Sequence, residues 1–215
     1  MTQPLSVPDG IVRDARVPLI GWRLVGWCGL AIAVMEALIL VVEGTGESGV
    51  RTVIRASART SVVLFAAAFA ASALARLHRS VVTRFLLANR RYLGVSFAVS
   101  HFSHLAAIVW LAWVSPEFRA SVEPATVILG GLAYVFLAAM TATSFDRSAA
   151  WLGPRRWRRL HLVGGWYIWL IFFVSYLPGD RDDPRSLLAF LLVLAVAGLR
   201  AWALVRRRRA AAAVA

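Results

Sequence analysis

The chain has 215 residues, of which 60% are hydrophobic and only 16% are charged. Because so few polar residues cannot cover a water-soluble globule, we expect lipid to surround most of this chain. All 24 basic residues are arginine, and against 11 acidic residues they give a net charge of +13. The arginines lie in short clusters between apolar runs, which is typical of a cytoplasmic membrane face and excludes a nucleic-acid partner. The single cysteine, Cys28, excludes an intrachain disulfide.

Taken in chain order, the sequence begins with a polar segment, residues 1–18, that lacks the pattern of a secretory signal peptide. Six apolar stretches follow, each long enough to cross a hydrocarbon core of roughly 30 Å as a helix. They are residues 19–42, 60–77, 92–114, 125–144, 159–178 and 186–205. We therefore predict an all-α integral membrane six-helix bundle, with one domain over residues 19–205. The tail, residues 206–215, is basic and then alanine-rich.

The distribution of arginine predicts how the bundle is oriented. Arginines gather in the N-terminal segment, in the second and fourth connections with the adjoining ends of their helices, and in the tail, whereas the other connections hold fewer arginines and most of the acidic residues. The arginines of these four segments are Arg13, Arg16, Arg23, Arg76, Arg79, Arg84, Arg90, Arg91, Arg147, Arg155, Arg156, Arg158, Arg159 and Arg206 to Arg209. Because an excess of arginine marks cytoplasmic loops, we expect a multi-pass protein of the inner (cytoplasmic) membrane with both termini in the cytoplasm.

Four histidines are the candidates for chemistry. His101 and His104 fall inside the third stretch, whereas His78 and His161 fall at the cytoplasmic ends of the second and fifth. Such residues within a membrane either serve a redox or metal function or are neutral imidazoles hydrogen-bonded between helices. The helix rise places His104 about 20 Å and His161 about 3 Å from the cytoplasmic ends of their helices, so they cannot share one iron. At the cytoplasmic end, His78 has a depth similar to that of His161 and could face it.

Two segments read RRYLGVSFAVSHFSHL (residues 90–105) and TSFDRSAAWLGPRRWRRLHLVGGWYIW (residues 143–169). Both resemble segments of the ferric reductase-like transmembrane family, which is a haem-binding six-helix bundle. The second is similar to the haem-binding membrane subunit of periplasmic methionine sulfoxide reductase systems. The resemblance implies one or two b-type haems, with His104 and His161 as axial ligands of the haem iron. His101 lies on the same helical face as His104, so at most one of the two ligates a given iron.

The second axial ligands stay open, because the chain departs from the family pattern. Val174 occupies the position of a second histidine on the fifth helix, and valine cannot ligate iron. An early position on the third helix, which many relatives use for a second haem, is an arginine here. Met35 and Glu36 on the first stretch lie level with His104. Methionine is an axial ligand in cytochromes, and a membrane carboxylate is expected to be neutral or hydrogen-bonded to one of the histidines.

The favoured hypothesis is a membrane b-type cytochrome, the haem-binding membrane component of an oxidoreductase, that passes electrons across the bilayer. No flavin or nicotinamide motif follows the sixth stretch, so we expect a separate electron donor, a quinol or a reductase. The expected acceptor is a periplasmic protein or a metal ion. Two alternatives remain: an accessory or structural membrane protein of the same fold without haem, and a small proton-coupled transporter that uses Glu36 and the intramembrane histidines.

Overall fold

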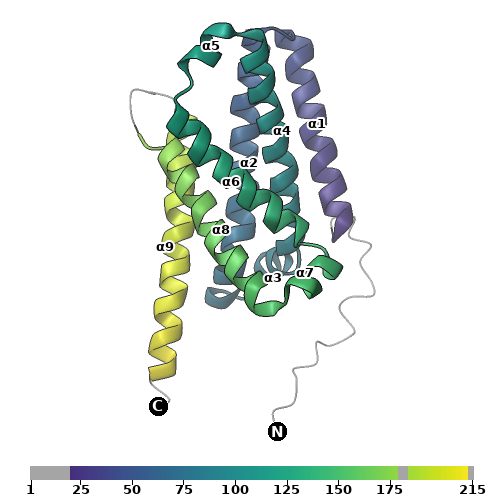
Figure 1. The fold of residues 1–215 in the computed structure, drawn as a ribbon. Coiled ribbons are helices and arrows are strands. Elements are labelled where there is room, and N and C mark those ends of the chain that lie inside the picture. Colours follow the sequence, from purple (N-terminus) through teal and green to yellow (C-terminus); the bar gives the residue numbers. More distant parts are fainter. Residues whose placement is uncertain (1–19, 179–183, 213–215) are drawn as a thin grey trace.

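A computed structural model describes residues 20–178 and 184–212 (Figure 1). The predicted segment 1–18 and the end of the tail lie outside these residues. Within the described ranges the chain is all-α, as predicted, with no strand. The helices are α1 (Trp22–Glu43), α2 (Glu47–Leu77), α3 (Val81–Ala88), α4 (Arg90–Val114), α5 (Pro116–Ser121), α6 (Pro124–Ala142), α7 (Asp146–Leu152), α8 (Pro154–Ser175) and α9 (Pro184–Ala212).

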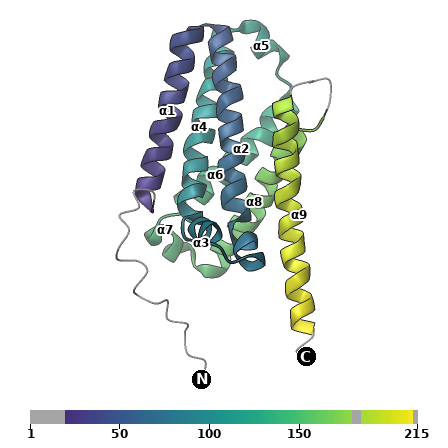
Figure 2. The same ribbon diagram turned by 180° about the vertical axis from the view of Figure 1, so that it is seen from behind.

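The long helices α1, α2, α4, α6, α8 and α9 lie alongside one another, and the short helices lie at the two ends of the molecule (Figures 1 and 2). Helices α3 and α7 lie at one end, which we call the basal end, and α5 lies at the opposite, apical end. Helix α1 begins and α9 ends at the basal end. At the start of α1, the Gly21 amide donates a hydrogen bond to Asn89 Oδ1 (3.1 Å), and Trp22 stacks on Phe145.

Five helices, α1, α2, α4, α6 and α9, are long and apolar enough to cross a membrane. The chain is therefore a multi-pass membrane protein. Helix α8 is not among these five: it has 22 residues, but its first turns carry four arginines. Large apolar side chains cover the outside of the molecule, and those of Val41, Val42 and Trp113 are more than four-fifths exposed. Such a surface is stable in lipid and not in water.

Two helices begin earlier than the apolar runs indicate. Helix α2 begins at Glu47, well before residue 60, and its first turns carry Arg51, Arg55 and Arg59. Arginine is a good helix former, so it interrupts the apolar run without interrupting the helix. Arg51 also forms an ion pair with Glu47 one turn earlier (2.6 Å). Helix α8 likewise begins at Pro154, ahead of its arginines and not at residue 159.

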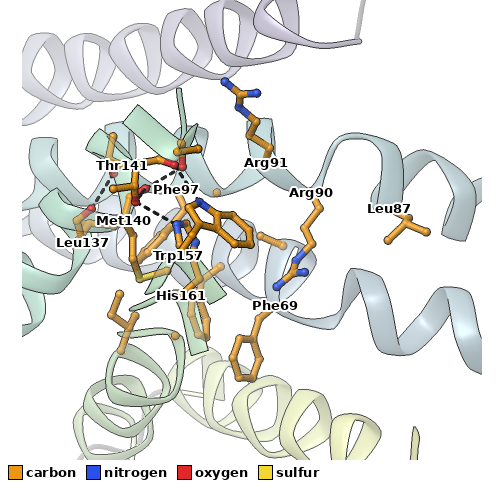
Figure 3. Close-up of a pocket in the computed structure, with 18 of the residues that line it drawn as sticks. Phe69, Leu87, Arg90, Arg91, Phe97, Leu137, Met140, Thr141, Trp157 and His161 are labelled. Atoms are coloured by element: carbon orange, nitrogen blue, oxygen red, sulfur yellow. Dashed lines mark hydrogen bonds between the residues drawn. The ribbon is translucent and has the colours of Figure 1, made fainter. Parts of the chain in front are cut away.

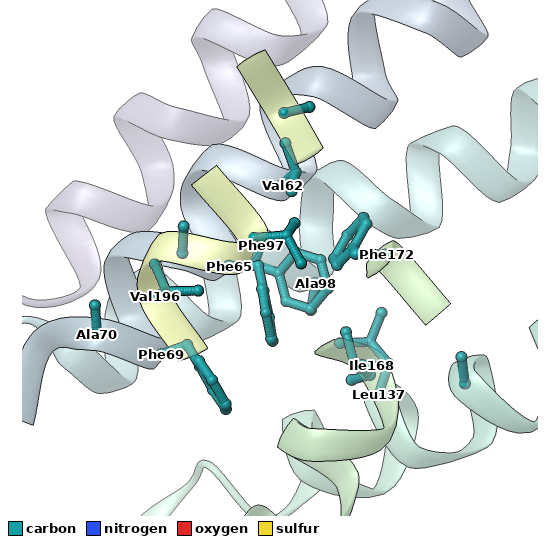
Figure 4. Close-up of a cluster of buried hydrophobic side chains, with 14 residues drawn as sticks. Val62, Phe65, Phe69, Ala70, Phe97, Ala98, Leu137, Ile168, Phe172 and Val196 are labelled. Atoms are coloured by element: carbon teal, nitrogen blue, oxygen red, sulfur yellow. The ribbon is translucent and has the colours of Figure 1, made fainter. Parts of the chain in front are cut away.

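Helix α2 lies at the centre of the bundle, where it packs on α1, α4 and α9. Its buried aromatic residues Phe65 and Phe69 meet Phe97 of α4 and Phe172 of α8 in one apolar core (Figure 4). Helices α6 and α8 approach closely at Gly164, where a Cβ atom would lie 2.6 Å from the sulfur of Met140. Small residues at helix crossings give membrane helices the close packing that the hydrophobic effect cannot supply in lipid.

Buried serines join α2 to α4. Ser57, Ser61 and Ser100 are fully buried. The hydroxyl groups of Ser61 and Ser100 lie 2.9 Å apart, and Ser100 Oγ donates to the carbonyl of Ser57 (3.3 Å). Because no water competes for these groups within a bilayer, the hydrogen bonds fix how α2 and α4 are rotated against each other. That rotation determines which residues of α4, including the two histidines, face α2.

Candidate cofactor site

A cavity of about 520 Å³ opens near the basal end, between α2, α4, α6 and α8 (Figure 3). We call it the basal cavity. Its lining includes Phe65, Phe69, Leu87, Arg90, Arg91, Gly94, Phe97, Leu137, Met140, Thr141, Thr143, Asp146, Trp157, His161, Gly165 and Ile168. Cofactor pockets in proteins are usually of this size and combine apolar walls with a few polar groups.

His161 is the only histidine in the described lining of the basal cavity, and several contacts hold its ring. The indole of Trp157 stacks on the imidazole with ring centroids 4.2 Å apart. The imidazole Nε2 lies 3.2 Å from Thr143 Oγ1, which itself donates to the carbonyl of Ala139 (2.8 Å). Trp157 in turn donates from Nε1 to the carbonyl of Thr143 (2.9 Å). The end of α6 and the start of α8 therefore position one imidazole at the cavity wall.

The mouth of the basal cavity is basic. Arg91 forms an ion pair with Asp146 (2.6 Å), and its guanidinium lies 5.7 Å from the ring of Trp22. Arg90 has no carboxylate partner within the described residues, and Figure 3 shows its guanidinium pointing toward Phe69. Apolar walls, one imidazole and a cationic mouth together suit a largely apolar ligand that carries acidic groups and binds imidazole.

The two histidines of α4 lie in the apical half, where side chains surround them. The ring of His101 packs against those of Phe97, His104, Tyr134 and Phe172, at centroid distances of 5.3, 5.3, 4.9 and 5.5 Å. The buried Nδ1 of His101 has no hydrogen-bond partner among the described residues. A macrocycle laid against this imidazole would have to displace aromatic rings. The structure thus places His101 as a packing residue with one unsatisfied nitrogen.

His104 makes hydrogen bonds to α2. Its Nδ1 lies 3.1 Å from Ser57 Oγ and 3.1 Å from the carbonyl of Ile54. Such a bond to a backbone carbonyl fixes the Nδ1–H tautomer and directs the lone pair of Nε2 elsewhere, as in many ligating histidines. The tautomer suits a ligand. The surroundings do not show a large cavity at this imidazole, since His104 is absent from the lining of the basal cavity and stacks on His101.

The candidate partners of His104 on α1 make other contacts. The sulfur of Met35 accepts a hydrogen bond from Thr60 Oγ1 at 3.8 Å. Both carboxylate oxygens of Glu36 accept from Ser103 Oγ, at 2.7 and 2.5 Å. The carboxylate of Glu36 is therefore partnered, as expected of a membrane acid, but by a serine and by neither histidine.

Val174 and His78 do not provide a second ligand. Val174, at the position where the resemblance implied a histidine, is 56% exposed, whereas Phe172, two residues earlier, is buried against His101. Residue 174 therefore faces away from the core of this bundle. His78 ends α2 with an exposed side chain, and it is not part of the basal cavity lining.

His104 and His161 lie at different levels of the bundle. His104 contacts α2 at Ser57, and the basal cavity that His161 lines reaches α2 at Phe65, Ala68 and Phe69. These three residues lie about 12–18 Å from Ser57 along α2. Within the described residues, no group of three or more His, Cys, Asp or Glu side chains gathers to hold a metal ion.

Sequence reasoning missed the contacts that hold the His161 ring. Trp157 and Thr143 both lie in the segment 143–169 that carries the resemblance, but neither was predicted to contact His161. Trp157 lies one turn before His161 on α8, a spacing that could have indicated the stacking, whereas the contact with Thr143 depends on how α6 packs against α8. Comparison of the chain with protein-family models, with curated proteins and with solved structures gave no match.

Proposed function

We propose that this protein is a six-span membrane cytochrome that holds one b-type haem in the basal cavity, with His161 as an axial ligand. The observation that carries the proposal is the coincidence, in one cavity of about 520 Å³, of an ordered imidazole, aromatic and aliphatic walls and a basic mouth. A bound haem supplies one-electron chemistry at its iron. The chain supplies the ligand, an apolar surrounding and positive charge near the haem carboxylates.

The residues of the basal cavity fit this group. Phe65, Phe97 and Ile168 offer apolar surface to a macrocycle, and Arg90 and Arg91 offer charge-assisted hydrogen bonds to carboxylates. To present Nε2 to an iron, His161 would have to give up its hydrogen bond to Thr143 Oγ1. That bond joins two uncharged groups, so its loss costs only about 1 kcal/mol. The apical histidines fit less well because aromatic rings pack around His101, and the proposal is therefore limited to one haem.

The proposal includes the topology. We propose that α8 is the sixth span and that the basal end faces the cytoplasm. Both termini of the chain would then lie in the cytoplasm. The basal end holds most of the arginines, whereas the apical end holds the acidic residues Glu43, Glu47, Glu117 and Glu123. This asymmetry is the usual signal of a cytoplasmic face. The start and the end of the helical region also lie together at the basal end, as an even number of spans requires.

Absorption spectroscopy tests the proposal. The full chain, produced with an adequate supply of haem and purified in detergent, should show a Soret band that shifts on reduction with dithionite. His161→Ala should remove most of this band, whereas His78→Ala, at an exposed histidine of the same end, should leave it unchanged. A colourless preparation would refute the cytochrome and favour an accessory protein without haem. A full signal in His161→Ala would refute the ligand.

A further inference from the structure

Three arginines from three helices converge at the basal end, beside Phe69. The guanidinium of Arg200 on α9 lies 4.0 Å from the centroid of the Phe69 ring, and its Nη1 donates to the Phe69 carbonyl (2.8 Å). Arg90, at the start of α4, points toward Phe69 (Figure 3). Arg76 follows Phe69 by seven residues, so it lies on the same face of α2 about 10 Å nearer the basal end. We call Arg76, Arg90 and Arg200 the arginine cluster.

No acidic residue of the described part of the chain neutralises the arginine cluster. None of its three members forms an ion pair there, and Arg200 lies within the repulsive field of both Arg90 and Arg76. Arg200 uses one of its five N–H donors on the Phe69 carbonyl and lies over the rings of Phe69 and Trp166, but none of these groups carries a negative charge. Three like charges held together at a membrane surface are stable when an anion lies among them.

The depth of Arg200 indicates where that anion lies. Arg200 precedes the arginine run that begins at Arg206 by six residues, or about 9 Å of helix. A guanidinium at this depth lies near the boundary between headgroups and acyl chains, where the phosphate of a phospholipid is within its reach. Arg76 and Arg200 do not line the basal cavity. The arginine cluster thus adjoins that cavity, with Arg90 shared between the two.

We propose that the arginine cluster binds the phosphate of an anionic phospholipid between α2 and α9, in the leaflet at the basal end. Basic pockets between membrane helices on the cytoplasmic side bind such headgroups in general. Anionic lipid satisfies the cluster better than zwitterionic lipid, because a choline headgroup brings its own cation. This inference does not depend on haem, and it holds for the protein with or without a cofactor.

The test uses the full chain, purified in detergent and freed of lipid. Phosphatidylglycerol and phosphatidylcholine with the same acyl chains are titrated separately, and the midpoint of thermal unfolding is followed by tryptophan fluorescence. Phosphatidylglycerol should raise the midpoint, and phosphatidylcholine should not. Arg76→Gln and Arg200→Gln should each weaken phosphatidylglycerol binding about fivefold. Arg209→Gln, on the opposite face of α9, is the matched control and should leave binding unchanged.

Several outcomes would overturn the proposal. Equal effects of the two lipids would mean that the site does not recognise anionic charge. If Arg76→Gln binds phosphatidylglycerol as well as the unmodified protein does, the arginine cluster is not the binding site. Because Arg76 is exposed, this variant still provides the test if Arg200→Gln fails to fold. Inorganic phosphate that reproduces the shift would identify a free anion and not a lipid as the ligand. A shift that haem loading abolishes would assign the cluster to the haem carboxylates instead.

Discussion

Replacement of Gly164 by valine tests whether the contact of α6 with α8 maintains the basal cavity. A Cβ at this position would lie 2.6 Å from Met140 Sδ and 3.2 Å from Phe136 Cδ1, and valine adds two methyl groups beyond it. Overpacking of this kind costs about 1–3 kcal/mol. The higher helix propensity of valine returns only a few tenths of a kcal/mol, so we expect a net loss of about 1–2 kcal/mol in the free energy of unfolding. Met140 lines the cavity, so its displacement should also reduce the haem retained.

The assay is reversible unfolding in mixed micelles, followed by tryptophan fluorescence, with the Soret absorbance per protein recorded in parallel. Gly131→Val on α6 is the control, since a Cβ there meets no atom within 4 Å. The double variant Gly164→Val with Met140→Ala should recover at least half of the lost stability, because the smaller side chain removes the closest clash. The reasoning is refuted if Gly164→Val is as stable as Gly131→Val, or if Met140→Ala restores nothing.

Three further predictions address α1, α8 and the topology. Ser103→Ala should destabilise the protein by about 1–3 kcal/mol, because the carboxylate of Glu36 loses its hydrogen-bond donor. The loss of stability should be smaller in a Glu36→Leu background, and equal losses in both backgrounds would contradict the pairing of Ser103 with Glu36. Val174→His should leave the absorption spectrum unchanged, since this position is exposed, and a new low-spin haem signal would show that it faces a cofactor. In a cysteine-free background, Arg79→Cys near α3 and Glu117→Cys in α5 should react with an impermeant maleimide from opposite sides of the membrane, and labelling of both from one side would refute the orientation.

Apolar length alone locates four of the membrane helices. The stretches 19–42, 92–114, 125–144 and 186–205 correspond to α1, α4, α6 and α9, with most ends placed within three residues. Helix α2 shows where this rule stops. Its arginines end the apolar run but not the hydrogen-bonded helix, so hydropathy cannot locate its start. For the same reason α9 continues through the arginines of the tail to Ala212.

The sequence predicted which histidines are candidates and at what depth they lie, but not which side chains surround each of them. Helix rise gives the level of His104 and of His161 from sequence alone. The rotation of a helix about its axis depends on packing, and in this bundle it turns Phe172 inward and Val174 outward. A family pattern therefore cannot by itself assign the direction of residue 174. Trp157 lies one turn before His161 on α8, so helix spacing could have indicated that their rings meet, whereas the contact of His161 with Thr143 depends on how α6 packs against α8.

The apical and basal halves of the bundle differ in whether their polar side chains have partners within the chain. This difference indicates in which half a ligand is expected. In the apical half, Glu36 and His104 find partners within the chain, and among the described residues the buried Nδ1 of His101 and hydroxyl of Tyr176 stay unsatisfied. Because a bilayer core offers no water, this pairing gives Glu36 and His104 the partners that they need without an external group. At the basal end, by contrast, no carboxylate of the described residues pairs with Arg90 or Arg200, which lie beside the basal cavity. Substitutions in the apical half should therefore change stability alone, whereas basal substitutions should also change what the protein binds.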